Sequence, residues 1–132
     1  MTARYTKPPS LAELEEMAHE ALKTIPDEIK RHTHDVVIRV DDFPDEETEK
    51  EMGLETPFDL LGLYRGTPIG EMGAGHTAQN VDMVFLYRRP LLDYWCEMEE
   101  DLLGLIRHVM IHEICHHLGL SDDDMERIEA EA

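Results

Sequence analysis

The sequence is poor in cysteine and has no long apolar run, and both shortages exclude classes of protein. Its 132 residues include only two cysteines, Cys96 and Cys115, without CxxC spacing. A disulfide framework therefore does not fit, and we expect two buried free thiols. No stretch approaches the roughly 18 apolar residues of a membrane span, and residues 1–10 lack the apolar core of a signal peptide. We therefore expect a cytoplasmic protein with no membrane partner.

Basic residues are also scarce. Twelve Lys and Arg residues stand against thirty Asp and Glu residues, which gives a formal net charge of −18 at pH 7. Such a charge repels the phosphate groups of nucleic acids and the headgroups of anionic lipids, so we expect no nucleic-acid partner. We interpret most of the acids as a solvated surface that keeps the protein soluble. A preference for basic partners is the alternative interpretation.

The rest of the composition is sufficient for a folded domain. Hydrophobic residues make up 42% of the chain and charged residues 32%, which is typical of a soluble globular protein. A chain of 132 residues can bury one core but is short for two. We therefore expect a single domain over residues 1–132.

Helical and extended patterns alternate along the first half of the chain. Ser10 and Glu13 have the spacing of a capping box, and apolar residues then recur at helical spacing until Pro26, after which a short helical turn is expected. Consecutive β-branched residues predict a strand at residues 35–42 with both faces at least partly covered. The charged run at residues 43–57 indicates an exposed loop with a turn of helix.

The second half begins with strands and ends with helices. Strands are expected at residues 60–66 and 81–90, separated by a glycine-rich irregular loop at residues 67–80. A short helical stretch near residues 93–100 and a long helix at about residues 101–118 follow.

The end of the chain has its own helix signals. Gly119 is expected to end the long helix, and Ser121 with Asp124 is expected to cap a last short helix.

The long helix carries the motif His-Glu-x-x-His at residues 112–116. Because each helical residue turns about 100°, His112 and His116 lie one turn of roughly 5.4 Å apart and can bind the same ion. Glu113 lies beside that pair, within reach of a water on the metal. In a chain of this composition the motif arises by chance about once in sixteen sequences, so it is not sufficient alone.

Two residues beyond the motif make it more specific. Gly119 lies seven positions after His112 and Asp122 lies ten positions after it, and requiring both lowers the chance rate to about one in three thousand. Glycine can adopt the positive φ that ends a helix in a sharp turn, and the chain then returns Asp122 toward the metal as a third ligand. Three protein ligands leave a fourth position for water, which is typical of a catalytic zinc site.

Other histidines compete for the metal. His108 lies two turns before His116, and the rise of about 12 Å prevents both from sharing an ion with His112, so we expect packing or indirect support from His108. His117 lies more than about 90° around the helix from the metal direction, and His76 lies in the glycine-rich loop. We expect structural or solvent roles for both.

Other groups near the motif are weaker candidates. Cys115 flanks the histidine pair, but its short side chain and its angle favour an inert core residue. Asp123 and Asp124 stay open as alternatives to Asp122, although the spacing favours Asp122.

The segment HEICHHLGLSDD resembles the extended HExxHxxGxxD form of the metzincin zinc signature, and its doubled histidine resembles the small bacterial zincin-like metallopeptidases, also called minimal zincins. IPDEI, VVIRVDDFP, LLGLYRGTP and FLYRRP precede it in the order of that family, so the resemblance covers most of the chain. It implies an α+β (mixed α/β) zincin-like domain with a small, three- to four-stranded mixed sheet. It also implies Zn2+ bound by His112, His116 and Asp122, with Glu113 as the catalytic base. The metzincin methionine turn is not matched, because only Met125 lies near the motif.

We therefore predict a zinc-dependent metallopeptidase that acts on a peptide or protein substrate. The peptide would lie along an exposed sheet edge, with residues 61–66 of the second strand and 84–89 of the third as candidates. Tyr64 and Tyr87 are candidates for oxyanion stabilisation, although packing is the favoured role for each. Two alternatives stay open: a non-enzymatic, zinc-stabilised acidic interaction module, and a zinc hydrolase of a non-peptide substrate.

Overall fold

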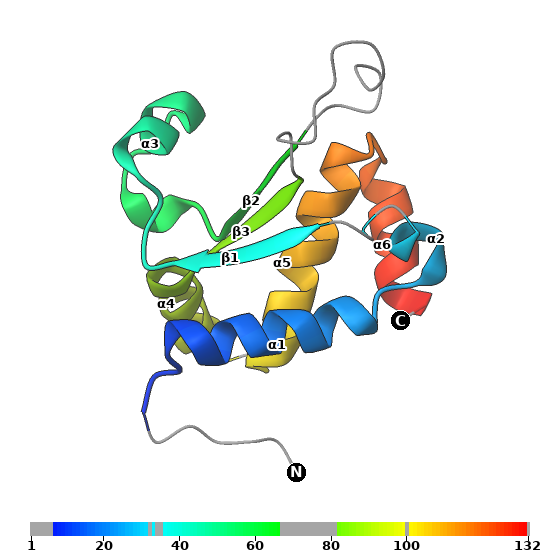
Figure 1. Ribbon diagram of the computed structural model, residues 1–132, viewed down its shortest axis with the longest axis horizontal. Coiled ribbons are helices and arrows are strands. Elements are labelled where there is room, and N and C mark those ends of the chain that lie inside the picture. Colours follow the sequence, from blue (N-terminus) through cyan, green and yellow to red (C-terminus); the bar gives the residue numbers. More distant parts are fainter. Residues whose placement is uncertain (1–6, 32, 34–35, 67–81, 100, 132) are drawn as a thin grey trace.

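The computed structural model describes residues 7–31, 33, 36–66, 82–99 and 101–131. These residues form six α-helices, one 3-10 helix and a three-stranded sheet, which confirms the expected α+β class (Figure 1). The glycine-rich loop expected at residues 67–80, with His76 in it, lies outside the described residues.

Helix α1, Leu11–Lys23, begins at the expected capping box. The Ser10 hydroxyl accepts a hydrogen bond from the Glu13 backbone N–H, and the Glu13 carboxylate accepts one from the Ser10 N–H, both at 3.1 Å. The predicted turn that follows is α2, Asp27–Lys30. Local hydrogen bonds between side chain and backbone therefore fix the start of α1.

The sheet is mixed and has the strand order β1-β3-β2. Strand β1, Val37–Asp41, is parallel to β3, Met83–Tyr87, and β2, Gly62–Arg65, is antiparallel to β3. The expected small mixed sheet is therefore confirmed, and it has three strands in the described part of the chain. The prediction that the strand at residues 81–90 could offer a free edge is wrong, because β3 is bonded on both sides.

Only one face of β1 is covered. Ile38 is buried and shares the core with Val84 and Leu86 of β3, whereas Val37 and Arg39 are exposed on the other face. The prediction that both faces of this strand are covered is therefore wrong. Consecutive β-branched residues indicated a strand, but they could not show which face would receive helices.

The acidic run forms more helix than expected. Residues read as a loop with one helical turn include α3, Glu46–Met52, and a 3-10 helix, Pro57–Asp59. The Asp45 carboxylate accepts the Thr48 N–H at 2.8 Å at the start of α3, and Gly53 ends it with a φ of 63°. Acidic residues in the first turn also interact favourably with the helix dipole, so the charge run suits a helix.

Helix α4, Arg88–Met98, begins earlier than expected, so residues 88–90 of the predicted strand are helical. Pro90 lies in its first turn, where a missing N–H costs no helical hydrogen bond. Cys96 is exposed, so the expectation that it is buried is wrong, whereas Cys115 is buried as expected. The reason is rotation: Cys96 lies five positions after the buried Leu91, about 140° around the helix.

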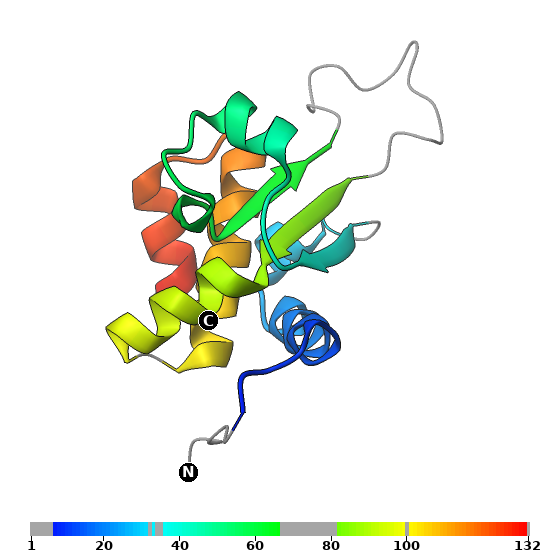
Figure 2. The same cartoon turned by 90° about the vertical axis from the view of Figure 1, so that its left-hand side faces the viewer.

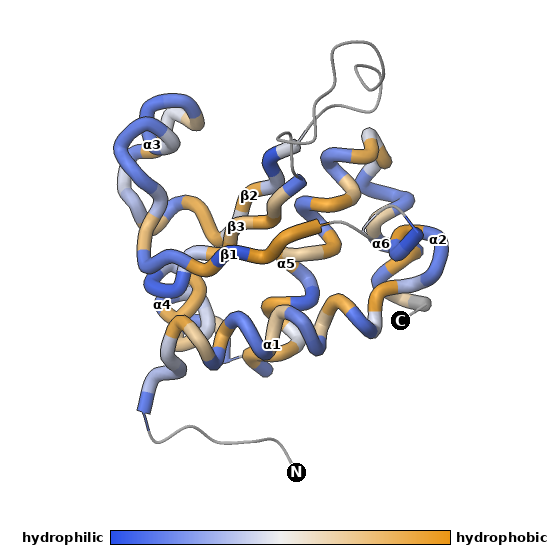
Figure 3. The backbone as a smooth tube through the Cα atoms, in the orientation of Figure 1, coloured by the Kyte–Doolittle hydropathy of each residue, from blue (hydrophilic) through white to orange (hydrophobic). Residues whose placement is uncertain are grey.

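Helix α5, Leu102–His117, is the centre of the molecule. Figure 1 and Figure 2 show it beside β2 and β3, and α1 and α6, Asp122–Glu131, also contact it. Eight of its sixteen residues are buried. In Figure 3 the hydrophobic parts of α1, α5 and the strands come together, whereas α3 is mostly hydrophilic. Packing on several sides therefore fixes the helix that carries the motif.

The surface of the described residues agrees with the composition. Among the described residues up to Ala130, no Asp or Glu side chain is buried, as expected for solvated acids, and Glu113 is half-buried. No helix in the described ranges is long and apolar enough to cross a membrane.

Candidate metal centre

Three side chains of α5 converge on one point. The ligand atoms offered by His112, Glu113 and His116 all lie within 4.8 Å of one another, and these residues form the one such group in the described part of the chain. The two imidazole rings have centroids 4.2 Å apart and planes at 64°. The helical spacing therefore brings both histidines and the glutamate of the motif together, as predicted.

The environment of His112 favours the form that binds metals. Burial lowers the pKa of His112, and the neighbouring His116 and His108 lower it further. A neutral imidazole carries the free lone pair that a metal requires. The residues present therefore fit a metal such as zinc.

The environment of Glu113 favours proton uptake. Burial raises the pKa of Glu113, while His116 and the backbone N–H of Tyr64, which acts as a hydrogen-bond donor to the carboxylate, oppose the rise. A carboxylate with a raised pKa is a better proton acceptor near neutral pH than an exposed one.

The end of α5 is a Schellman turn. Gly119 has a φ of 76°, its N–H donates to the His116 carbonyl at 3.1 Å, and the Leu120 N–H donates to the Cys115 carbonyl at 3.0 Å. A Cβ at Gly119 would meet nothing within 4 Å, so backbone conformation rather than space favours glycine here. The turn leads directly into α6, whose first residue is Asp122.

Asp122 approaches the histidine pair but does not join the group of three. It is exposed, and it is not among the residues whose ligand atoms lie within 4.8 Å of one another. Its charge nevertheless raises the pKa of His112 against the effect of burial. Asp124 is occupied elsewhere, since its carboxylate accepts from the Ser121 N–H and hydroxyl at 3.3 and 3.0 Å. Asp122 therefore stays the predicted third ligand.

The family of the chain follows from a comparison with protein families. The model of the Zincin-like metallopeptidase family matches residues 33–132, which include the whole motif. The chain belongs to this family. A comparison with curated proteins finds no match. Membership of the zincin-like family implies a metal ion, typically zinc, and the group of His112, Glu113 and His116 could hold one.

The two other histidines of α5 in this zincin-like protein have partners of their own. His108 Nδ1 lies 2.8 Å from a Glu129 carboxylate oxygen. The His117 ring stacks on the Tyr64 ring, with centroids 4.0 Å apart and planes at 18°. Burial raises the pKa of Cys115 to about 11, so its thiol stays protonated, in agreement with the expected inert core residue.

A pocket of about 280 Å³ opens beside the zincin motif. His112 and Glu113 form part of its lining, and Leu61 and Gly62 approach from β2. A Cβ at Gly62 would lie 2.8 Å from the Val109 side chain, so glycine allows β2 to approach α5. The sequence interpretation missed this role, although a glycine inside a strand often marks a close approach.

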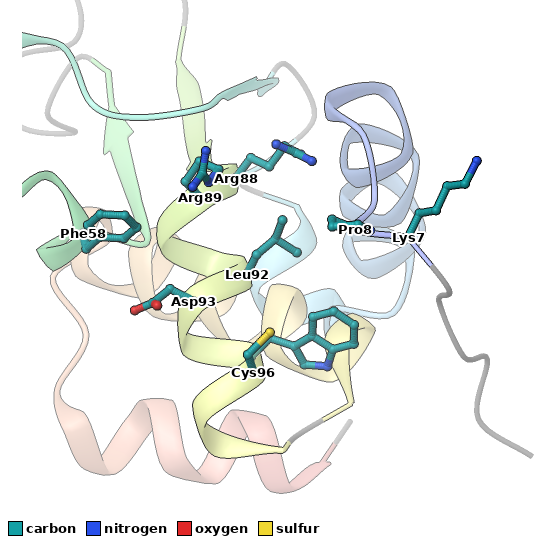
Figure 4. A pocket seen from close by; sticks show the side chains of 9 residues that line it. Lys7, Pro8, Phe58, Arg88, Arg89, Leu92, Asp93 and Cys96 are labelled. Carbon is teal, nitrogen blue, oxygen red and sulfur yellow. The ribbon is translucent and has the colours of Figure 1, made fainter.

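A larger hollow lies elsewhere, along α4. It has a volume of about 680 Å³, is lined in part by Phe58, Arg89 and Trp95, and shares no lining residue with the pocket beside the motif (Figure 4). Converging donor groups, rather than size, therefore identify the zincin site.

Proposed function

We propose that this zincin-like protein is a zinc-dependent metallopeptidase that hydrolyses peptide bonds with Glu113 as general base. The observation that carries the proposal is the convergence of His112, Glu113 and His116 within 4.8 Å, beside a pocket large enough for a substrate side chain. Family membership supports the same class of reaction.

His112, His116 and Asp122 would hold the zinc. When bound, zinc supplies a Lewis acid that polarises the scissile carbonyl and lowers the pKa of the attacking water. Glu113 would accept the proton of that water and pass it to the leaving amine. Its raised pKa suits both halves of this proton transfer, because the carboxylate must first take up and then release the proton.

Strand β2 is the best candidate for holding the peptide. It lies at the edge of the sheet, and it is the edge strand that packs against α5. The Tyr87 N–H donates to the Leu61 carbonyl at 3.0 Å, so the antiparallel alternation directs the backbone groups of Gly62 away from β3. A peptide could add to that edge as another strand.

The two tyrosines have contacts that support packing rather than oxyanion binding. The Tyr64 hydroxyl donates to the Asp82 carboxylate at 2.9 Å, and Tyr87 is buried, with 3% of its surface exposed. Neither hydroxyl therefore has a part in the proposed reaction.

The proposal is tested by incubating a broad peptide library with the zinc-loaded protein and analysing the products by mass spectrometry. We expect cleavage that stops with a chelator, returns with zinc and is absent with Glu113→Gln. Cleavage that survives the chelator, or that the Glu113→Gln protein performs equally well, would contradict the proposal.

A further inference from the structure

His117, the second histidine of the doubled pair, has no part in the reaction above, yet its ring has a defined contact. His117 follows His116 directly on α5, and its ring lies almost parallel to the Tyr64 ring, with planes at 18° and centroids 4.0 Å apart. Tyr64 belongs to β2, so this contact joins the motif helix to the edge strand. Flat stacking of this kind restrains both rings.

Tyr64 is held at its far end as well. Its hydroxyl donates to the Asp82 carboxylate at 2.9 Å, and Asp82 directly precedes β3. A Cβ at Gly66 would lie 2.2 Å from an Asp82 carboxylate oxygen, so the chain is closely packed around this acceptor. The Tyr64 side chain is therefore fixed both at its ring face and at its hydroxyl.

The backbone of the same residue reaches the motif. Tyr64 pairs with Val84, and the alternation set by the Tyr87 to Leu61 hydrogen bond directs the Tyr64 N–H away from β3. That N–H acts as a donor to the Glu113 carboxylate. Tyr64 therefore connects His117 and Asp82, through its side chain, to Glu113, through its backbone.

We propose that His117 and Tyr64 are a positioning pair for Glu113: their stacked rings hold the β2 backbone against the motif helix. His117 is then a positioning residue and not a metal ligand. This inference rests on the proposed function, since it concerns the orientation of the proposed base.

The test replaces His117 in two ways. His117→Ala removes the stack, and His117→Phe keeps a flat ring but removes both nitrogen atoms. We expect kcat of His117→Ala to fall by about ten- to a hundredfold, because small displacements of a reacting group have effects of that size. Zinc affinity should not change, while His117→Phe should recover kcat to within about threefold of the wild type.

Two controls separate positioning from general damage. His19→Ala removes an exposed histidine of α1 and should leave kcat unchanged. Ile38→Val removes a buried methyl group of β1, a strand with no part in the proposed site, so it should lower stability while leaving kcat within about threefold. If His117→Ala does not fold, His117→Leu fills the space without an aromatic ring and should give the same loss of kcat.

A second readout does not depend on activity. In the zinc-loaded protein, hydrogen exchange at the Tyr64 amide, followed by NMR, should be at least about tenfold faster in His117→Ala than in the wild type or His117→Phe. If the wild type cleaves no peptide while this exchange effect is present, the proposed function fails and the pairing stands.

Three results would overturn the inference. These are unchanged exchange at the Tyr64 amide in His117→Ala, loss of zinc in both His117 variants, and equal loss of kcat in His117→Ala and His117→Phe.

Discussion

Glu113 and Asp122 are both carboxylates near the histidine pair, but the protein surrounds them differently. Glu113 is half-buried on α5, and burial raises its pKa. Asp122 is exposed on the first turn of α6 and acts on His112 through its charge. A half-buried carboxylate with a raised pKa is suited to accepting a proton, whereas an exposed carboxylate is suited to completing a metal site.

Glu113→Gln should retain zinc and the fold but lower kcat by about 10²- to 10⁴-fold, because an amide cannot accept the proton of the attacking water. Steady-state kinetics on a peptide found in the library experiment and metal analysis of the same sample measure both effects. Wild-type turnover would show that Glu113 is not the base. Loss of zinc together with turnover would identify Glu113 as a ligand.

The same substitution should have a pH-dependent effect on the stability of the metal-free protein. Because burial raises the pKa of Glu113 above its ordinary value of 4.5, the stability that this group contributes is full below that value and is lost as the pH rises through the folded-state pKa. Gln cannot ionise, so the free energy of unfolding of Glu113→Gln relative to wild type should increase between about pH 4 and about pH 7. Urea unfolding at both pH values measures this difference, and a pH-independent difference would contradict it.

Asp122 and Asp124 should separate into a metal ligand and a helix cap. Asp122→Ala should weaken zinc binding markedly with little effect on metal-free stability. Asp124→Ala should lower stability by about 1 kcal/mol, because it removes the carboxylate that accepts from the Ser121 N–H and hydroxyl, and should leave zinc affinity unchanged. Zinc titration and urea unfolding of both variants decide the matter, and the opposite pattern would move the third ligand to Asp124.

At the scale of elements, the approach of β2 to α5 builds the wall of the pocket. Gly62 makes this approach possible, because a Cβ there would lie 2.8 Å from Val109 Cγ1 and 3.0 Å from the Phe85 carbonyl oxygen. Backbone atoms such as that carbonyl cannot move aside alone, so a side chain at Gly62 must displace the strand or the helix.

Gly62→Ala should therefore destabilise the protein by about 1–3 kcal/mol. The matched control is Gly104→Ala on α5, where the nearest atom to an added Cβ is 3.4 Å away and the change should be neutral or stabilising by up to about 1 kcal/mol. Adding Val109→Ala should relieve part of the overlap, so the double variant should lose less than the sum of the single variants. Denaturant unfolding of the wild type and of these four variants measures the losses, and additive losses in the double variant would contradict the proposed overlap.

At the scale of the whole molecule, the core is built without the metal. Buried residues of α1, α5, α6 and the sheet form one hydrophobic cluster, and the motif histidines are not part of it. A fold with such a core does not need zinc as its main support, unlike small domains that fold only around the ion.

We therefore expect near-stoichiometric zinc, one ion per chain, and a chelator should abolish peptide cleavage while preserving the helical circular dichroism spectrum. The melting temperature should fall on chelation, because a ligand that binds only the folded state stabilises it. Elemental analysis and thermal melts measure these effects. Unfolding on removal of zinc would instead favour the zinc-stabilised interaction module.

The sequence by itself determined the features that depend on neighbours along the chain. These features follow from contacts within about one helical turn, and the structure confirms their local geometry. They are the capping boxes at Ser10 and Ser121, the end of α5 at Gly119 and the spacing of His112 and His116. The family was recognisable for the same reason, since its motif is continuous in the sequence.

Only the tertiary structure decided which distant segments meet. The packing of the sheet and helices decides three features: the central place of β3, the exposure of Cys96 and the need for glycine at Gly62. His117 of α5 and Tyr64 of β2 lie far apart in the chain, and no local spacing indicates that their rings are in contact. Periodicity and capping act over a few residues, whereas strand order and ring contacts are set by the shape of a shared core, which no short segment contains.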